Sequence, residues 1–564
     1  MATVTTQDTP LRKPRFATLM LAVSMFMTGA CGLVAEYVMG TVATYILGNS
    51  IEQMSVTIAV MLLMMGLASH LQKYLTDAHL IEKFVAVEIA IALLSGFAPV
   101  AMFASFSLRP TLFGLVQYGA MSAIGFLIGL EIPLVTRLNE AYQGRLKANI
   151  ASIWSMDYLG AFVGALVWVF LLLRYVPITK VGFILGAANL LVAAMTLAYF
   201  YRLGLVHKRA LSVAGVCAAG IVLLLGVARV NAWALSLEQR LYVHPIVFSA
   251  TTKYQHLVLT HSRQADDYRL FINGNLQFSS TDEAIYHEQL VHPAMALAPD
   301  HQRVLILGGG DGMALREVLK YDDVEAVTLV ELDPEMVRLF STDPKLRQLN
   351  RDAFADARVH AAASAAVASA GVRPVYVEEQ RRKPNPAVEK VAEVEVFTLD
   401  ADRFIAEIPS QWNVILIDFP DPNAVELAKL YSKEFYLKLG NVLAEHGVVA
   451  VQATSPYHAK EAFLCILRTM DAAGWKTLPY HDNVPSFGDW AWVLLWKSPV
   501  SEQAFRQKIE HIEFNVDTRY LTPAVFQKAL VFGKRWLDSD DDAINTLAYP
   551  VLLQRYTQEG WLVP

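Results

Sequence analysis

The chain has 564 residues, of which 54% are hydrophobic and only 18% are charged. This composition excludes an intrinsically disordered protein and argues against a fully soluble one, since globular chains carry about 25% charged residues. Residues 1–240 carry 16 Lys and Arg against 10 Asp and Glu, whereas the remainder carries 31 against 43. A basic apolar half therefore precedes an acidic polar half, which argues against a nucleic-acid partner and is compatible with a cationic ligand.

Seven long apolar segments follow an N-terminal tail of residues 1–15. A membrane-spanning helix needs about 20 apolar residues, and each segment has this length with at most one acidic or basic residue. The segments are 16–35, 54–72, 89–108, 110–130, 148–173, 181–201 and 210–228. They predict a multi-pass transmembrane domain of seven helices over residues 16–230.

Four acidic residues, Glu36, Glu88, Glu131 and Asp157, lie in or beside these segments. Ionisable groups are costly within a membrane and are often functional there. Two interpretations stay open: the four residues fix the packing of the helices, or they act on a transported substrate.

After an interfacial linker at 231–250, the composition becomes that of a soluble protein. Residues 251–300 are expected to form a small β subdomain followed by a helix, with Asn273-Gly274 as a tight hairpin turn. Residues 301–500 alternate strands and helices, which is typical of a Rossmann-like α/β domain with a parallel sheet. Within that domain, 360–392 is expected to be an insertion, and 501–564 form a C-terminal extension.

The predicted strand at 304–307 runs into Gly308-Gly309-Gly310-Asp311-Gly312 and a helix. Glycines at such a turn let a ligand approach the backbone and the free N–H groups of the helix N-terminus. Glu331 follows 21 residues after Gly310, where an acid can accept hydrogen bonds from a ribose. Asp311 favours a ligand that presents an ammonium group over one that presents a carboxylate.

Two further clusters carry chemistry. Asp418-Phe419-Pro420-Asp421-Pro422 follows the predicted strand at 414–417, and its two carboxylates can converge on one cation or serve as binder and base. The second cluster, Asp282 to Glu288, combines acids, a phenol and an imidazole without the spacing of metal ligands. Three scattered cysteines likewise indicate no disulfide framework and no metal cluster.

Together these residues resemble the spermidine synthases, or polyamine aminopropyltransferases, over roughly residues 245–500. The matching motifs are Tyr254-Gln255, Asn273 to Gln277, Tyr286-His287-Glu288, Gly308 to Gly312, Arg316-Glu317-Val318, Glu331, Asp400, Asp418 to Pro422 and Gln452. The segment Val484 to Trp490 and the seven preceding apolar segments resemble the membrane-fused branch of that family.

The resemblance implies that the amine of a diamine attacks the aminopropyl carbon of decarboxylated S-adenosylmethionine, with Asp418 as the base. The donor would be bound by Gln255, His287, Gly308, Gly310, Asp311, Glu331 and Asp400. The amine would be bound by Gln277, Tyr286, Asp421 and Gln452. No metal and no cofactor besides this co-substrate is expected, because the sulfonium is already a good leaving group. A homo-oligomer, a dimer or larger, is also expected.

The sequence departs from the family at the acceptor side. Asn273 replaces a usual Asp, Phe419-Pro420 replaces small hydroxyl residues, and Phe487 replaces a common Tyr. Putrescine is the expected acceptor, with cadaverine, agmatine and spermidine as alternatives. Two other functions stay open. Asp311 argues against an S-adenosylmethionine-dependent methyltransferase, and the intact Asp311, Asp418 and Asp421 argue against a non-catalytic polyamine sensor or transporter.

Two arguments disagree about the side of the membrane that carries the catalytic domain. Eleven Lys and Arg lie before the first span or in loops on its side, against three on the opposite side. The positive-inside rule therefore puts the N-terminus in the cytoplasm, and seven spans then put the catalytic domain outside. Because the donor is made in the cytoplasm, we expect the catalytic domain there.

Overall fold

The computed structural model describes residues 14–47, 50–140, 146–355, 393–497 and 501–559. The chain folds into two compact units, Met1–Pro245 and Ile246–Pro564, which we call the helical unit and the α/β unit. The insertion predicted at 360–392 and most of the N-terminal tail lie outside the described residues.

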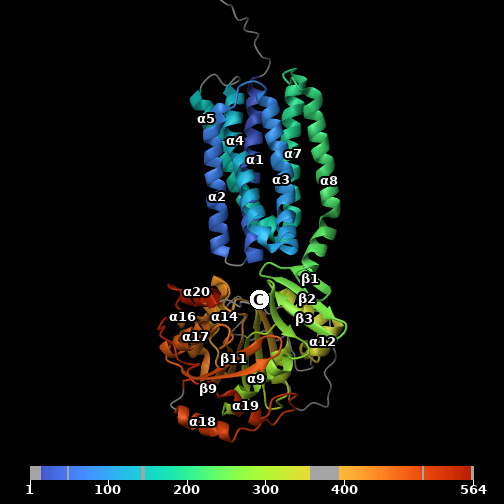
Figure 1. The fold of residues 1–564 in the computed structure, drawn as a ribbon. Coiled ribbons are helices and arrows are strands. Elements are labelled where there is room, and N and C mark those ends of the chain that lie inside the picture. The colour runs from blue at the N-terminus through green and yellow to red at the C-terminus, as the bar shows by residue number, and fades with distance from the viewer. Residues whose placement is uncertain (1–13, 48–49, 141–145, 356–392, 498–500, 560–564) are drawn as a thin grey trace, which may run out of the picture. The chain divides into compact units, whose positions relative to one another are not determined.

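Long apolar helices make up the helical unit (Figure 1). Among the described residues, seven helices are long and apolar enough to cross a membrane, and they correspond to the seven predicted segments. These helices are α1 (Pro14–Leu47), α2 (Ser50–Leu71), α3 (Leu80–Leu108), α4 (Phe113–Glu140), α5 (Leu146–Val167), α7 (Ile178–Arg202) and α8 (Arg209–Gln239). Short helical turns extend or link them: η1 (Gln72–Tyr74), η2 (Pro110–Leu112), the π-helical η3 (Trp168–Leu172) and α6 (Leu173–Tyr175).

Three pairs of these helices approach closely at glycines spaced four residues apart. A Cβ atom at any of these glycines would lie within 2.8 Å of a backbone carbonyl oxygen of the partner helix, so no larger residue fits. The glycines are Gly125 and Gly129 of α4 against α2, Gly160 and Gly164 of α5 against α1, and Gly182 and Gly186 of α7 against α3. Small residues at this spacing are typical of packed membrane helices.

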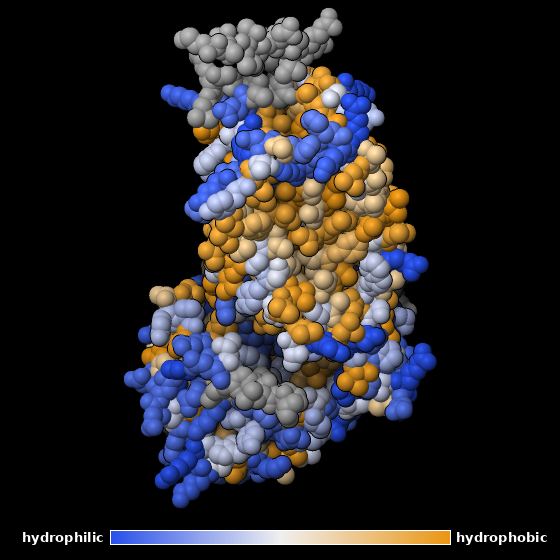
Figure 2. All heavy atoms as spheres, turned by 45° about the horizontal axis from the view of Figure 1, so that its top comes forward, coloured by the Kyte–Doolittle hydropathy of each residue, from blue (hydrophilic) through white to orange (hydrophobic). Residues whose placement is uncertain are grey.

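The outer surface of the helical unit is apolar. Figure 2 shows hydrophobic side chains gathered over the middle of the helices, with hydrophilic residues towards their ends. Leu63, Leu115, Phe170 and Leu224 are among the large hydrophobic side chains exposed here. An apolar surface of this extent exceeds the small patches that soluble monomers expose, and it marks contact with lipid or protein.

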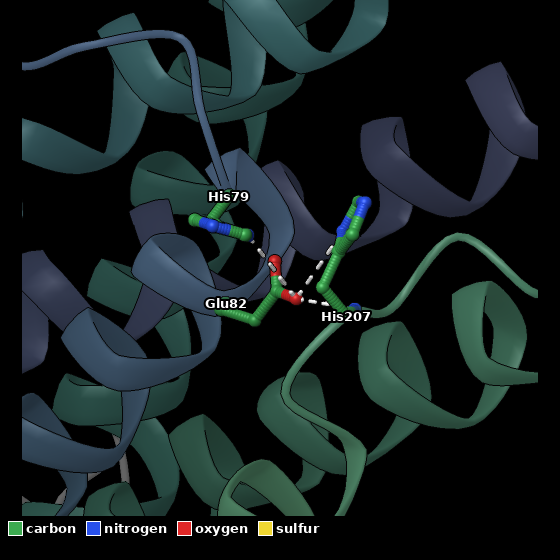
Figure 3. A group of neighbouring side chains, drawn as sticks. All are labelled: His79, Glu82 and His207. Atoms are coloured by element: carbon green, nitrogen blue, oxygen red, sulfur yellow. Dashed lines mark hydrogen bonds and ion pairs between the residues drawn. The ribbon is translucent and has the colours of Figure 1, made fainter.

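Glu82, near the start of α3, holds the loop that precedes α8 (Figure 3). Its Oε1 accepts hydrogen bonds from the backbone N–H groups of His207 (2.6 Å) and Lys208 (3.1 Å). The Nδ1 atoms of His79 and His207 lie 3.9 and 3.7 Å from the same oxygen. Two segments that are 125 residues apart in the sequence are thereby joined.

A four-stranded antiparallel sheet opens the α/β unit, in the order β1 (Ile246–Thr251), β2 (His256–Ser262), β3 (Asp267–Ile272) and β4 (Asn275–Ser279). Asn273 and Gly274 connect β3 to β4 with positive φ angles of 50° and 83°, as the predicted tight hairpin turn requires. Within the predicted linker 231–250, α8 continues to Gln239 and β1 already begins at Ile246.

A seven-stranded sheet forms the core of the α/β unit, in the order β10-β11-β9-β8-β5-β6-β7. The strands are β5 (Arg303–Gly308), β6 (Ala326–Glu331), β7 (Glu393–Thr398), β8 (Trp412–Asp418), β9 (Leu443–Gln452), β10 (Lys476–Val484) and β11 (Gly488–Trp496). The five strands from β9 to β7 are parallel, whereas β10 and β11 pair antiparallel.

The expectation of an all-parallel sheet is therefore corrected at one edge. β10 escaped prediction because its sequence contains Pro479 and a run of polar residues, which are poor strand formers. Proline is tolerated in an edge strand, where its missing N–H group breaks no ladder, and β10 is such a strand.

Helices cover both faces of this sheet, since successive residues of β5 enter two separate hydrophobic clusters. Val304 and Ile306 join one cluster, and Leu305 and Leu307 join the other. The helices are α9 (Glu283–Leu297), α10 (Met313–Val318), α11 (Pro334–Thr342), α12 (Pro344–Leu349), α14 (Ala401–Glu407), α15 (Val425–Ala428), α16 (Lys433–Val442), α17 (Lys460–Ala472), α18 (Glu502–Glu510), α19 (Pro523–Ala529) and α20 (Val551–Glu559), with the 3₁₀ turns η4 (Ala353–Ala355) and η5 (Lys429–Tyr431). The carboxyl ends of the parallel strands stay available for a ligand.

Candidate active site

The glycine loop after β5 adopts a backbone that other residues rarely allow. Gly308 and Gly309 have φ angles of +86° and +68°. A Cβ atom on Gly308 would lie 2.2 Å from the carbonyl oxygen of Asp418, so only glycine permits this approach. The loop therefore lies directly against the carboxyl end of β8.

Glu331, at the end of β6, faces this loop as its position in the sequence predicts. Its carboxylate accepts hydrogen bonds from the N–H groups of Gly310 (3.1 Å) and Asp333 (2.9 Å). Burial nevertheless raises its pKa to about 7, because these N–H groups compensate only part of the lost hydration. Gln255 reaches the same corner, where its side chain hydrogen-bonds to Asp333.

Four predicted residues meet at the centre of the site. The hydroxyl of Tyr286 donates a 2.7 Å hydrogen bond to Oδ1 of Asp418. His287, Asp311 and Asp418 have polar side-chain atoms that all lie within 4.8 Å of one another, and His287 Nε2 is 3.8 Å from Asp311 Oδ2. The residues come from α9, the glycine loop and β8, so the fold assembles them from three separate segments.

Burial and neighbouring charges shift the pKa values in this cluster. Burial raises the pKa of Asp418 to about 6, with the opposing effects of His287 and Tyr286 outweighed by burial and the nearby charge of Asp311. Burial alone would lower the pKa of His287, but the hydrogen bond to Glu283 and the charges of Asp311 and Asp418 raise it to about 9. At neutral pH, His287 is therefore a cation beside two carboxyl groups.

Glu283, one helical turn before His287 on α9, orients the His287 ring. The sequence patterns had assigned no role to Glu283. Nδ1 of His287 lies 2.8 Å from the backbone carbonyl oxygen of Glu283 and 3.0 Å from its Oε2. Arg316 makes two further hydrogen bonds to the Glu283 carboxylate, of 3.0 and 2.8 Å, and Arg519 adds another. The spacing of four residues between Glu283 and His287 on one helix was the available signal.

Asp421 is held at the second end of the loop after β8. Its Oδ2 accepts hydrogen bonds from the hydroxyls of Thr454 (3.0 Å) and Tyr556 (2.8 Å). Burial raises its pKa to about 6 against these hydrogen bonds. Tyr556 belongs to α20, 135 residues along the chain, and no motif of the sequence pointed to it.

Gln452, at the end of β9, uses its amide group within the protein. The amide nitrogen donates to the carbonyl oxygen of Phe419 (2.6 Å) and to the hydroxyl of Tyr431 (2.5 Å), and the amide oxygen accepts from the N–H of Thr454 (3.0 Å). With these partners Gln452 fixes the loop that carries Asp418 and Asp421.

Aromatic rings line the cluster on the side of β11. The ring of Phe487 lies 6.0 Å from that of Tyr286 and 4.9 Å from that of Trp490, between ring centres, and Trp492 lies 5.6 Å from Tyr286. Asp282 holds the turn that carries Phe487 by accepting hydrogen bonds from Ser486.

Two predicted residues lie apart from this central cluster. Gln277, on β4, hydrogen-bonds to the carbonyl oxygen of Asn275 at 3.3 Å. Asp400, after β7, caps α14 by accepting from the N–H of Arg403 and forms a 2.6 Å ion pair with Lys429. A ligand that binds Asp400 would therefore contact a carboxylate that is already paired with Lys429.

Two groups of described residues offer three potential metal ligands each within 4.8 Å: His287, Asp311 and Asp418, and His79, Glu82 and His207. In both groups the protein already engages potential ligands. Nδ1 of His287 is held by Glu283, and Oε1 of Glu82 accepts two backbone N–H groups.

Comparison with known proteins identifies the family of the chain. Residues 283–368 and 384–507 match the model of the spermine/spermidine synthase domain. Polyamine aminopropyltransferase 2 of Ralstonia nicotianae is 38% identical over 84% of this chain and 86% of its own. Polyamine aminopropyltransferase 1 of Streptomyces coelicolor is 36% identical over 97% of this chain and 95% of its own.

Among solved structures, the spermidine synthase of Thermotoga maritima is 23% identical, with a TM-score of 0.41, and the match covers 52% of this chain and 87% of that one. The match to the Streptomyces coelicolor relative covers 97% of this chain, so it extends through the apolar helices. The chain therefore belongs to the spermine/spermidine synthase family and is a polyamine aminopropyltransferase.

Proposed function

We propose that this enzyme transfers the aminopropyl group of decarboxylated S-adenosylmethionine to putrescine, giving spermidine and methylthioadenosine. The observation that carries this proposal is the contact of Tyr286 with Asp418 beside Asp311 and His287, at the carboxyl ends of β5 and β8. Such a cluster suits two cationic substrates that must be held side by side.

In the proposed reaction, Asp418 accepts a proton from the attacking ammonium group of putrescine. The freed nitrogen lone pair forms the new C–N bond, while the electron pair of the breaking C–S bond stays on the sulfonium sulfur, which becomes neutral. A pKa of about 6 leaves Asp418 ionised at neutral pH and brings it closer to the pKa of an amine than an ordinary Asp. The chemistry needs positioning and one proton acceptor, and we expect no metal.

The proposed binding roles are those that the family resemblance implies. Asp311 and Asp421 would hold the ammonium groups of donor and acceptor, and Glu331 would accept the ribose hydroxyls beside Gly308 and Gly310. Gln255 would support the donor corner, and Asp400 would accept the adenine amino group next to Lys429. We assign Gln452 to positioning Asp421, and we keep Gln277 as an acceptor-side residue at the edge of the site.

We also propose that the helical unit crosses the bacterial inner membrane. Three observations support this proposal: the seven apolar helices, the exposed hydrophobic side chains, and the three helix pairs that pack closely at glycines. Seven spans put the two ends of the unit on opposite sides of the membrane. Fusions of alkaline phosphatase and of a fluorescent protein after Arg240 decide between the positive-inside rule, which predicts phosphatase activity, and the cytoplasmic donor supply, which predicts fluorescence.

A direct assay tests the catalytic proposal. The purified full chain is incubated with decarboxylated S-adenosylmethionine and, separately, with putrescine, cadaverine, agmatine and spermidine, and products are identified by mass spectrometry. We expect spermidine and methylthioadenosine in equal amounts. Transfer to another amine in preference would overturn the choice of putrescine, and methylated product from S-adenosylmethionine would overturn the reaction type. Sedimentation of the same sample measures the proposed homo-oligomer.

A further inference from the structure

Inside the helical unit, three acidic side chains come together without a basic residue: Glu88 of α3, Glu131 of α4 and Asp157 of α5. Glu88 and Glu131 are 0% and 3% exposed, and Asp157 is partly buried. Among the described residues of this unit, no Lys, Arg or His is buried. The three carboxyl groups therefore have no cation of the protein within the bundle.

These acids come from three helices and interact with one another. The carboxyl group of Glu131 interacts with those of Glu88 and Asp157. Cys31 of α1 faces both glutamates. Asp157 fills the space that a side chain at Gly29 would need, because its Oδ1 lies 2.7 Å from the position of a Cβ atom there. Helices α1, α3, α4 and α5 thus bring together the acidic residues that are buried or partly buried at this place in the helical unit.

Glu88 is the least satisfied member of this group. Apart from its approach to the carboxyl group of Glu131, neither of its oxygens has a hydrogen-bond partner among the described residues. A buried polar group without a partner costs free energy, and two adjoining carboxylates in an apolar interior cannot both be ionised unless a cation joins them. The pair must therefore hold a proton or a bound cation.

The surroundings favour an organic cation over a metal ion. Calcium and magnesium require about six or more oxygen ligands, many of them carbonyl groups or water. Ile91, Ile128 and Leu134, three residues from the two glutamates on the same helices, are buried and apolar. Apolar side chains of this kind suit the methylene chain of an alkylamine, whose ammonium group would form ion pairs with the carboxylates.

We infer that Glu88 and Glu131, with Asp157 beside them, form a second binding site for a protonated diamine within the helical unit. This inference rests on the proposed membrane insertion and on the amine substrate of the enzyme. A dication ionises both glutamates and displaces the proton they share, so binding releases about one proton. A site of this kind would let the chain take up or release the substrate or product amine within the membrane.

The first test counts bound amines. Equilibrium dialysis of the full chain in lipid nanodiscs with labelled putrescine, at moderate salt, should give two amines per chain. The double variant Glu88→Gln/Glu131→Gln should retain one and keep the rate of aminopropyl transfer within about twofold. Glu52→Gln, which changes an exposed carboxylate of α2, is the matched control and should retain both.

A second test needs no variant and therefore does not depend on correct folding of one. Dicyclohexylcarbodiimide modifies protonated carboxyl groups in apolar surroundings, and mass spectrometry of peptides locates the adducts. We expect adducts on Glu88 or Glu131 and at least fivefold protection by putrescine, but none by an equal concentration of sodium chloride. Two amines per chain in the double variant, or labelling without protection, would overturn the inference.

The two proposals fail in different ways. Absence of aminopropyl transfer in the wild type refutes the catalytic proposal, whatever the number of bound amines. Normal transfer with a single bound amine that Asp418→Asn/Asp421→Asn removes leaves catalysis intact and refutes the second site.

Discussion

Buried acidic residues are held in opposite ways in the two units of this protein. In the α/β unit, Glu317 contacts His292, Arg316 and Lys320, and Glu288 accepts three backbone N–H groups from residues 519–521. In the helical unit, Glu88 is equally buried, yet its polar neighbour is another carboxyl group. The α/β unit thus provides partners for these two buried glutamates, whereas the helical unit leaves Glu88 and Glu131 without a base.

The active site also contains acidic residues whose burial is only partly offset by protein partners. Asp418 and Asp421 are partly buried, and burial raises their pKa values to about 6. Glu283 and Glu317, by contrast, have pKa values held below the usual range, because hydrogen bonds and charges from His and Arg outweigh burial. Asp418 and Asp421 keep raised pKa values despite their hydrogen bonds, and acids whose burial is only partly offset in this way are where an external cation is expected.

The largest expected effect comes from Asp418→Asn, which keeps the volume of the side chain and removes the proton acceptor. Loss of a general base lowers the turnover rate by about 10²–10⁴-fold. Single-turnover kinetics with saturating donor and putrescine measure the rate, and donor affinity is the control that should stay near the wild-type value. Turnover close to normal at neutral pH would refute the assignment of Asp418.

Glu283→Gln tests the contribution of a buried acid that is paired with basic residues. Breaking a buried charge pair by removing one partner costs about 3–5 kcal/mol. In this variant His287 loses this carboxylate partner, and Arg316 keeps only Glu317 as a carboxylate partner. Scanning calorimetry should show the loss in the α/β unit. Glu335→Gln, whose partner Arg338 is exposed, is the control and should cost about 0–1 kcal/mol. Since the pKa of Glu283 is lowered, its contribution is present at neutral pH and is lost only as the pH falls below the usual glutamate range.

Asp311→Asn tests whether an acid of the active site selects a cationic ligand. Asp311 should attract the ammonium group of decarboxylated S-adenosylmethionine and repel the carboxylate of S-adenosylmethionine. We expect calorimetry to show a strong preference for the decarboxylated compound, reduced by about 10–100-fold in the variant. Equal affinities in the wild type would contradict the role of Asp311.

Tyr286→Phe should act on the pH profile more than on the rate. The Tyr286 hydroxyl stabilises the ionised form of Asp418, so its loss should raise the pKa of Asp418. The wild-type kcat/KM should rise with pH around about 6, as Asp418 loses its proton, and the variant should need a higher pH. A hydrogen bond to a charged group contributes about 1.5–3 kcal/mol, which sets the upper limit of the shift at about one to two pH units. An unshifted acidic limb would show that another group controls the rate.

Local patterns made much of this arrangement predictable from the sequence. The seven apolar segments, the hairpin at Asn273-Gly274 and the strands that lead to Gly308, Glu331 and Asp418 all follow from periodicity and turn chemistry. The antiparallel edge strand β10 did not, because its polar residues and proline hide a strand that tertiary pairing creates. Glu283 and Tyr556 also escaped prediction, since their roles depend on contacts that chain folding brings together.

The smallest expected effect belongs to Glu88→Gln, and it separates the two classes of acid most sharply. Glu88 has no protein cation to lose, and an amide at its place can donate a hydrogen bond to Glu131. The free energy of unfolding should therefore change by less than about 1 kcal/mol or rise, since one net hydrogen bond contributes about 0.5–1.5 kcal/mol. Scanning calorimetry of the detergent-solubilised chain beside Glu283→Gln provides the measurement. A loss as large as that of Glu283→Gln would mean that Glu88 fixes the helices after all, and the contrast between the two units would disappear.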